Sequence, residues 1–293
     1  MSTIEQWVEQ FQGFGTYPSP ERYAALFDPE GTVFDPGMER PLTATEVAPH
    51  MAGILKLMPD LHFTIARWRA QDDTVFVEAH NSATVAGQKL LWDAVYCVTL
   101  CEGRVIRGRR YYDRAPLLAR MSPTFPALPP YDPVVDQALE HTDENEIPSS
   151  GVSTSEFLER YERLWQAPEP QAFAVVYHPH GRMWNPGMNR PIRRAEIPGY
   201  YTSLFAAIPD LRMQRLAWAG DQHVLYIEWQ ANGHLAGKPL QLNVIDCFEF
   251  IDGHVIYGTA YFDTVALLSM LHPAINRVHF APSAHASVEI SHS

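Results

Sequence analysis

An aspartate, Asp246, lies within the apolar run LNVIDCFEF at residues 242–250. Side chains of an extended strand alternate between its two faces, so Val244, Asp246 and Phe248 are expected to share one face. A carboxyl group among apolar side chains must find a partner, or its pKa rises. A raised pKa suits general acid–base chemistry or hydrogen-bond donation to a developing oxyanion. The same pattern also fits an acid that is bonded across an interface between domains.

A nine-residue pattern occurs twice, as VFDPGMERP at 33–41 and as MWNPGMNRP at 183–191. Pro-Gly is typical of a turn, and both copies keep it. The first copy carries Asp35 where the second carries Asn185. Either residue is compatible with the turn, so this difference indicates that the two copies need not have the same function.

The two nonapeptides belong to a longer repeat, in which an offset of 150 residues holds without a gap. The positions that match at this offset include residue types that are typical of turns and cores. The pairs include Pro59/Pro209, Trp68/Trp218, Cys97/Cys247, Gly108/Gly258 and Asp113/Asp263. The sequence therefore predicts two copies of one domain, over residues 1–121 and 152–271. A Pro-rich acidic linker is expected over 122–151, and a C-terminal tail over 272–293.

Each copy is predicted to place its helices before its strands. In the second copy, STSEFLERYERLW at 153–165 begins with a capping Ser and a nearby Glu, followed by apolar residues at helical spacing. This order predicts an α+β fold with helices on one face of an antiparallel sheet. In the first copy, helical pieces are expected at 20–27 and 43–58, and strands at 61–70, 74–85, 90–100 and 104–113.

Composition and charge exclude several protein classes. The net charge is −12, which argues against a protein that tracks nucleic-acid phosphates. The N-terminus does not resemble a signal peptide, and no stretch approaches the roughly 18–20 apolar residues that span a bilayer. We therefore expect a cytoplasmic protein without nucleic-acid or membrane partners.

The sequence predicts no cofactor and no metal site. It contains no Gly-rich phosphate loop, no HExxH motif and no nucleophilic Ser elbow. Its three cysteines form no CxxC motif, and Cys97 and Cys247 lie in apolar runs, where a buried small side chain is expected. Glu78 and Glu228 recur at equivalent strand positions, which favours a structural or inter-copy ion pair with the Arg-rich end strand, near Arg107 and Arg109.

Each copy places its helices before a sheet whose long strands begin at Pro-Asp-Leu and end at Tyr-Tyr-Asp. This arrangement resembles the SnoaL-like polyketide cyclase branch of the nuclear transport factor 2-like superfamily. The resemblance covers residues 4–121 and 154–271. It implies two tandem cone-shaped α+β barrels, each with helices packed on a curved antiparallel sheet around an apolar pocket. The two sheets are expected to pack together as an intramolecular pseudo-dimer, and further homo-oligomerisation is left open.

The resemblance also implies roles for particular residues. VIDCFEFIDG at 244–253 resembles the strand that holds the catalytic Asp of SnoaL-like cyclases, and the match is Asp246. GTVFDPG at 31–37 resembles the segment of ketosteroid isomerase that carries its general base, and the match is Asp35. For Asp35, turn chemistry is the alternative.

Two further residues match family positions. Tyr161 matches an oxyanion-binding Tyr of the first helix, although a helix Tyr also suits a core. SnoaL-like cyclases carry a His on the strand before the catalytic Asp, and His234 would reach Asp246 if these strands form a hairpin. A surface His is the alternative. The first copy has Tyr96 at the position of Asp246, and Tyr96 could also donate a hydrogen bond.

We therefore expect a cofactor-independent acid–base enzyme acting on a hydrophobic carbonyl compound, by aldol-type cyclisation, isomerisation or lyase chemistry. The second copy is favoured as the working site. An epoxide-hydrolase-like or other water-adding enzyme is one alternative, and a non-catalytic small-molecule-binding module is another. The residues expected to contact substrate are Trp92, Trp184, Asn185 and Phe248.

Overall fold

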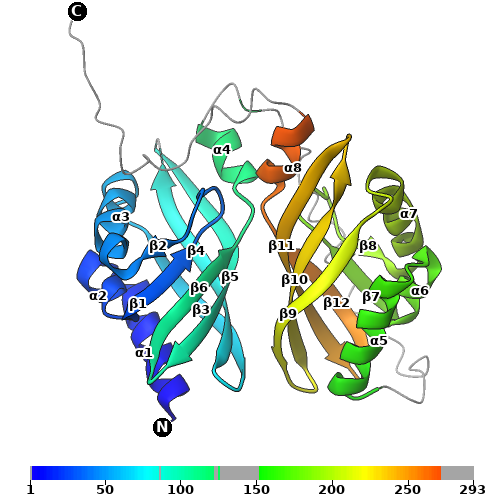
Figure 1. Cartoon of the computed structure of the whole chain (residues 1–293), viewed down its shortest axis with the longest axis horizontal. Helices are drawn as coiled ribbons and strands as arrows, with labels where there is room; N and C mark the ends of the chain where they lie inside the picture. The colour runs from blue at the N-terminus through cyan, green and yellow to red at the C-terminus, as the bar shows by residue number, and fades with distance from the viewer. Residues whose placement is uncertain (1, 86, 122–124, 126–151, 272–293) are drawn as a thin grey trace, which may run out of the picture.

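The structure is a computed structural model that describes residues 2–85, 87–121, 125 and 152–271. It contains two similar α+β domains, each with a six-stranded sheet and helices on the outer face (Figure 1). The expected linker at 122–151, apart from Phe125, and the expected tail at 272–293 lie outside the described residues.

The first domain consists of α1 (Thr3–Thr16), α2 (Pro20–Ala24), β1 (Phe27–Phe34), β2 (Leu42–Thr43), α3 (Ala44–Leu57), β3 (His62–Gln71), β4 (Thr74–Val85), β5 (Gln88–Cys101), β6 (Arg104–Tyr111) and α4 (Ala115–Met121). The second domain repeats this order with α5 (Thr154–Gln166), α6 (Pro170–Val175), β7 (Tyr177–Trp184), β8 (Ile192–Arg193), η3 (Arg194–Glu196), α7 (Ile197–Ala207), β9 (Arg212–Gly220), β10 (Val224–Leu235), β11 (Lys238–Ile251), β12 (His254–Tyr261) and α8 (Thr264–Leu271).

The four long strands of each domain form the antiparallel meander that the sequence predicts, but each sheet also contains two strands that were not predicted. The strand orders are β2-β1-β6-β5-β4-β3 and β8-β7-β12-β11-β10-β9, and β1 runs parallel to β6. The sequence does not predict β1, because this strand contains Pro29 and Gly31, and both residue types are typical of loops. The helical piece expected at 20–27 ends at Ala24, where the chain turns into this strand.

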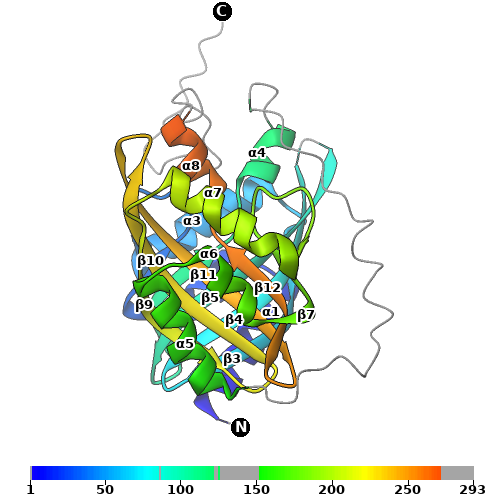
Figure 2. The ribbon, with the colours of Figure 1, turned by 90° about the vertical axis from the view of Figure 1, so that its right-hand side faces the viewer.

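Capping residues mark the beginning of the long helices α1 and α5. The Ser153 hydroxyl accepts a hydrogen bond from the Glu156 backbone, and the Glu156 side chain accepts one from Ser153, so the capping box expected for α5 is present. Ser2 and Glu5 form the same capping box at α1. Figure 2 looks onto α5, α6 and α7, which cover the outer face of the second sheet. None of the helices among the described residues combines the length and apolarity needed to cross a membrane.

The two sheets pack face to face, which confirms the predicted pseudo-dimer. The Phe76 and Tyr226 rings, equivalent by the offset of 150, stack across the interface at 5.7 Å. Cys97 and Cys247 are buried in the same apolar cluster, as expected. Each domain therefore has one sheet face against its partner and the other against its own helices (Figure 1).

Two buried glutamates are bound at this interface. Glu228 is fully buried, and its carboxylate accepts hydrogen bonds from Arg109 and Tyr111 of the first domain. This confirms the ion pair expected between the copies.

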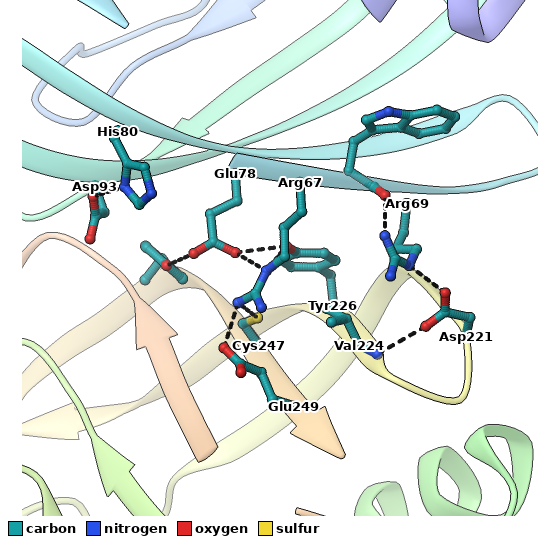
Figure 3. Close-up of polar contacts among 12 residues, drawn as sticks. Arg67, Arg69, Glu78, His80, Asp93, Asp221, Val224, Tyr226, Cys247 and Glu249 are labelled. Atoms are coloured by element: carbon teal, nitrogen blue, oxygen red, sulfur yellow. Dashed lines mark hydrogen bonds and ion pairs between the residues drawn. The ribbon is translucent and has the colours of Figure 1, made fainter. Parts of the chain in front are cut away.

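The equivalent Glu78 has a different set of donors. It accepts hydrogen bonds from Tyr226 at 2.7 Å and from Tyr261 at 2.8 Å. Arg67 of its own sheet binds the same carboxylate at 2.7 Å and also reaches Glu249 at 2.8 Å (Figure 3). The pseudo-symmetric pair therefore keeps the buried acid and its tyrosine donor, but takes the arginine from a different strand.

We predict that Glu228→Gln lowers the free energy of unfolding by about 3–5 kcal/mol, because Arg109 would remain buried without its charged partner. Urea denaturation followed by tryptophan fluorescence measures this loss. Glu249→Gln is the matched control, because its side chain is 39% exposed and its loss should cost less than about 1 kcal/mol. Equal small losses in both variants would contradict this account of the interface.

Candidate active site

Asp246 lies on β11 and faces the core between the second sheet and its helices. Its residue is only 9% exposed. The Tyr161 hydroxyl on α5 donates a hydrogen bond to Asp246 Oδ2 at 3.2 Å. Strand alternation therefore predicted the orientation of Asp246, and the alternative of an acid bonded across the domain interface does not hold. Glu78 and Glu228 fill that interface role instead.

Burial raises the pKa of Asp246 from 3.8 to about 7, because water no longer solvates the carboxylate. The Tyr161 hydrogen bond opposes this shift. The Trp229 indole acts in the same direction as Tyr161, although its Nε1 atom falls short of hydrogen-bond geometry. Asp246 can therefore both take up and release a proton near neutral pH.

The surroundings of Asp246 are aromatic. Tyr161 meets Phe248 edge to face at 4.9 Å between ring centroids and lies 6.0 Å from Trp229. Phe248 is itself 2% exposed, so the residue expected to bind substrate packs directly beside the Asp246–Tyr161 pair. Such a wall excludes water and keeps the carboxyl group poorly solvated.

Neighbouring tyrosines remain neutral. Burial raises the pKa of Tyr161 and of Tyr177 well above 10, and the negative charge of Asp246 raises both further. Burial likewise raises the pKa of Tyr201, whose hydroxyl lies 3.5 Å from that of Tyr161. These phenols can therefore donate hydrogen bonds without losing their protons.

Asn185 forms the turn after β7, as its pattern predicts. Its backbone carbonyl accepts a hydrogen bond from Met188, and its side-chain amide donates to the Tyr200 hydroxyl at 3.0 Å. The charge of Asp246 acts on Tyr200, which links Asn185 to the same region. Trp184 is half-buried at the end of β7, and its indole N–H has no hydrogen-bond partner among the described residues.

His234 does not lie beside Asp246. The expected β10–β11 hairpin forms, but His234 opposes Pro239 whereas Asp246 opposes Ile227. The seven-residue separation along β10 amounts to about 24 Å at roughly 3.4 Å per residue. The His234 ring instead contacts Asp210 at 2.7 Å, and both side chains are exposed. The predicted His234–Asp246 contact is therefore wrong, because the strand register carries His234 to the tip of the hairpin.

The first domain holds a different group at the corresponding place. Asp35 forms a buried ion pair with Arg110, whose Nη2 lies 2.5 Å from Asp35 Oδ2. Tyr96 lies under the Arg110 guanidinium, 5.8 Å from its ring centroid, and donates a hydrogen bond to Asn81 at 3.2 Å. Asp35 and Tyr96 thus both contact Arg110. Trp92, half-buried, packs against this core, and its backbone carbonyl accepts from Asn81.

The sequence analysis did not identify Arg110, although a comparison of equivalent positions in the two copies points to it. The offset of 150 pairs Arg110 with Ala260, and it pairs Tyr96 with Asp246. In the structure Arg110 opposes Tyr96 just as Ala260 opposes Asp246. The second domain therefore has a buried acid where the first has a tyrosine, and lacks the arginine that neutralises Asp35.

An open groove of about 800 Å³ lies elsewhere, between α1, β3 and Asp221. The Arg69–Asp221 ion pair at 2.8 Å forms part of its wall (Figure 3). Neither Asp35 nor Asp246 lines this groove, so its size does not make it the active-site candidate. Among residues 2–85, 87–121 and 152–271, no group of three His, Cys, Asp or Glu side chains is placed to hold a metal ion.

The model of the SnoaL-like domain family matches the chain twice, over residues 4–108 and 158–257. None of the curated proteins compared with the chain matches it significantly.

Three solved structures each resemble a part of the chain. A protein of ketosteroid isomerase-like fold from Catenulispora acidiphila DSM 44928, in complex with trimethylamine, is 19% identical with a TM-score of 0.37, over 39% of this chain and 91% of its own. A protein assigned as a SnoaL-like polyketide cyclase from Jannaschia sp. CCS1 is 17% identical with a TM-score of 0.37, over 42% and 96%. An NTF2-like protein from Burkholderia pseudomallei K96243 is 14% identical with a TM-score of 0.39, over 42% and 99%.

The raised pKa of Asp246 makes a prediction about stability. The folded state holds the Asp246 proton up to about pH 7, whereas the unfolded chain releases it near pH 4. The stabilisation from this proton is therefore present at low pH and is lost as pH rises through 7. Relative to Asp246→Asn, the unfolding free energy of the wild type should fall by about 3 kcal/mol between pH 5 and pH 8.

Chemical denaturation of both proteins across this range checks the difference. Other groups, such as Asp113, whose pKa burial raises to about 6, titrate in both proteins and cancel in the comparison. Parallel stability curves for the two proteins would show that Asp246 does not titrate in this window.

Proposed function

Because the chain belongs to the SnoaL-like family, we propose that it is an enzyme in which Asp246 transfers protons to and from a hydrophobic carbonyl compound, without a cofactor. The observation that carries this proposal is the buried Asp246 carboxyl, whose pKa is raised to about 7 and which no arginine or lysine of the described residues neutralises. A general acid–base group works best when its pKa lies near the working pH.

The roles follow from the two oxygens of Asp246. Tyr161 binds Oδ2 and stabilises the charged form, which leaves Oδ1 as the proton acceptor. In the carboxylate form, Asp246 takes a proton from the carbon next to the substrate carbonyl, and the C–H electron pair moves into an enolate. Half-exposed apolar side chains around this core, including Tyr200, Leu242 and Phe262, favour an apolar substrate.

The protonated Asp246 then completes the reaction. It can return the proton to a different carbon, which is isomerisation. Alternatively, the enolate attacks a second carbonyl of the same molecule, and Asp246 protonates the new alkoxide, which is aldol-type ring closure. The reverse of that step is lyase chemistry. All three need one proton-transfer group and no external reductant or oxidant.

The proposal is tested by deuterium exchange at the carbons next to the carbonyl of 2-tetralone, a hydrophobic ketone, followed by NMR. The wild type is expected to accelerate exchange, and Asp246→Asn to lower the enzymatic rate by about 10²–10⁴-fold. Asp210→Asn is the matched control, because it removes an exposed carboxylate that is bound to His234, and it should leave the rate unchanged.

Two results would contradict the proposal. Full exchange activity in Asp246→Asn would remove Asp246 from the chemistry. Saturable binding of ketones without any exchange in the wild type would instead favour a non-catalytic binding module.

A further inference from the structure

The interface between the two domains has a twofold pattern, in which equivalent positions exchange contacts. The Tyr111 hydroxyl donates a hydrogen bond to Glu228, and the equivalent Tyr261 hydroxyl donates one to Glu78. An interface of this kind uses the same patch on both sides and is self-complementary in shape.

The segments that follow β6 and β12 repeat this exchange in their backbones. The Arg114 N–H donates to the Asp263 carboxylate at 3.1 Å, and the equivalent Thr264 N–H donates to the Asp113 carboxylate at 3.0 Å. Backbone geometry and shape therefore do not prevent two first domains, or two second domains, from pairing in the same way. Any discrimination between unlike and like pairs must come from side chains.

The charged side chains break the twofold pattern in one direction. Among the described residues, four ion pairs cross between the domains, and in each the first domain supplies the arginine and the second domain the acid (Figure 3 shows two of them). They are Arg67–Glu249, Arg69–Asp221, Arg109–Glu228 and Arg114–Asp263. At the positions of these four arginines the second domain has Ala217, Ala219, Thr259 and Thr264. None of the four pairs therefore has a counterpart of opposite direction.

A pair of two second domains would bury acids without a cation. Glu228 is fully buried, and in such a pair Thr259 of the other copy would replace Arg109 beside it. The tyrosine donor would remain, because Tyr261 is equivalent to Tyr111. A buried carboxylate that loses its cation is strongly destabilised, or must take up a proton. This arrangement would occur twice in each such pair.

A pair of two first domains would instead leave arginines without acids. Arg67 and Arg69 bind acids of the second domain through contacts of 2.8 Å each. The residues that replace these acids in the first domain are uncharged, and they are Gln71 for Asp221 and Thr99 for Glu249. The arginines of two like faces would also repel one another.

We infer that this one-way charge pattern makes the interface selective for unlike domains. The sheet face of the first domain binds a second domain and rejects another first domain, and the sheet face of the second domain rejects its own kind more strongly. Each face is thus an interaction surface with a defined partner, which is the oppositely charged domain of this chain or of another copy. Two chains can then associate through these faces only by exchanging unlike halves.

The test uses the full chain with a protease recognition sequence inserted after Asn145, in the segment that joins the domains. Folded protein is cleaved there, so that the two halves are no longer covalently linked. Cleaved proteins with and without ¹⁵N labelling are mixed, brought to the midpoint of their urea unfolding curve and dialysed, so that pairs form again. Native mass spectrometry distinguishes the pairs, because the two halves differ in mass.

Random association would give unlike pairs and like pairs in equal total amounts. We expect unlike pairs, including those with one labelled half, to exceed all like pairs together by at least about tenfold, because each like pair carries unpaired charges.

Two double variants test whether charge is the cause. Arg109→Gln with Glu228→Gln removes the buried ion pair but keeps side chains that form hydrogen bonds. Pairs of second domains then no longer bury this acid, and we expect the ratio of unlike to like pairs to fall by at least about fivefold. Arg69→Gln with Asp221→Asn removes a half-exposed pair, so it perturbs folding less and should lower the ratio by a smaller factor.

Arg40→Gln with Glu46→Gln is the matched control. It also removes one arginine–glutamate ion pair, but the two side chains are 61% and 36% exposed at the start of α3. The ratio of unlike to like pairs should be unchanged in this variant. Circular dichroism after dialysis shows which cleaved proteins have refolded.

The inference is overturned if wild-type like pairs are as abundant as unlike pairs. It is also overturned if the refolded halves form no pairs, because faces that select each other must associate without the covalent link. Undiminished selectivity in both interface double variants would show that shape and not charge decides the pairing.

Discussion

A carboxyl group that leaves water must be bound by a cation, by hydrogen-bond donors or by a proton. Five buried acids among the described residues meet this constraint in different ways. Glu228 and Glu78 have an arginine together with tyrosine donors at the interface, Asp263 has Arg114, and Asp35 has Arg110. Asp246 has a tyrosine partner and no arginine partner among the described residues, so burial shifts its pKa toward neutrality. The proposed chemistry depends on Asp246.

Duplication within one chain explains how the acids could diverge. In a homodimer, any change on one sheet appears on both, so Asp35 and Asn185 could not coexist at equivalent positions. In the tandem chain, the interface keeps a buried glutamate on each side while Arg67 serves one and Arg109 the other. The interiors differ more, with the Asp35–Arg110 pair in one domain and the Asp246–Tyr161 pair in the other.

Sequence reasoning predicted features that depend on local pattern or on the repeat itself. Alternation along β11 placed Asp246 inside, the Ser153–Glu156 pair marked the start of α5, and the recurrence of Glu228 indicated an interface acid. It failed where register or long-range pairing decides. His234 contacts Asp210 and not Asp246. Arg110 was not predicted, because no local pattern shows which side chain an arginine will contact on the neighbouring strand.

The most direct measurement is a ¹³C NMR titration of the Asp246 side-chain carboxyl in wild type and in Tyr161→Phe. The account predicts a midpoint at about pH 7 in the wild type. It predicts a higher midpoint in Tyr161→Phe, because the lost hydrogen bond had favoured the carboxylate. A wild-type midpoint near pH 4, the ordinary range of an aspartate, would show that Asp246 is well solvated or paired and would contradict its role as the proton-transfer group.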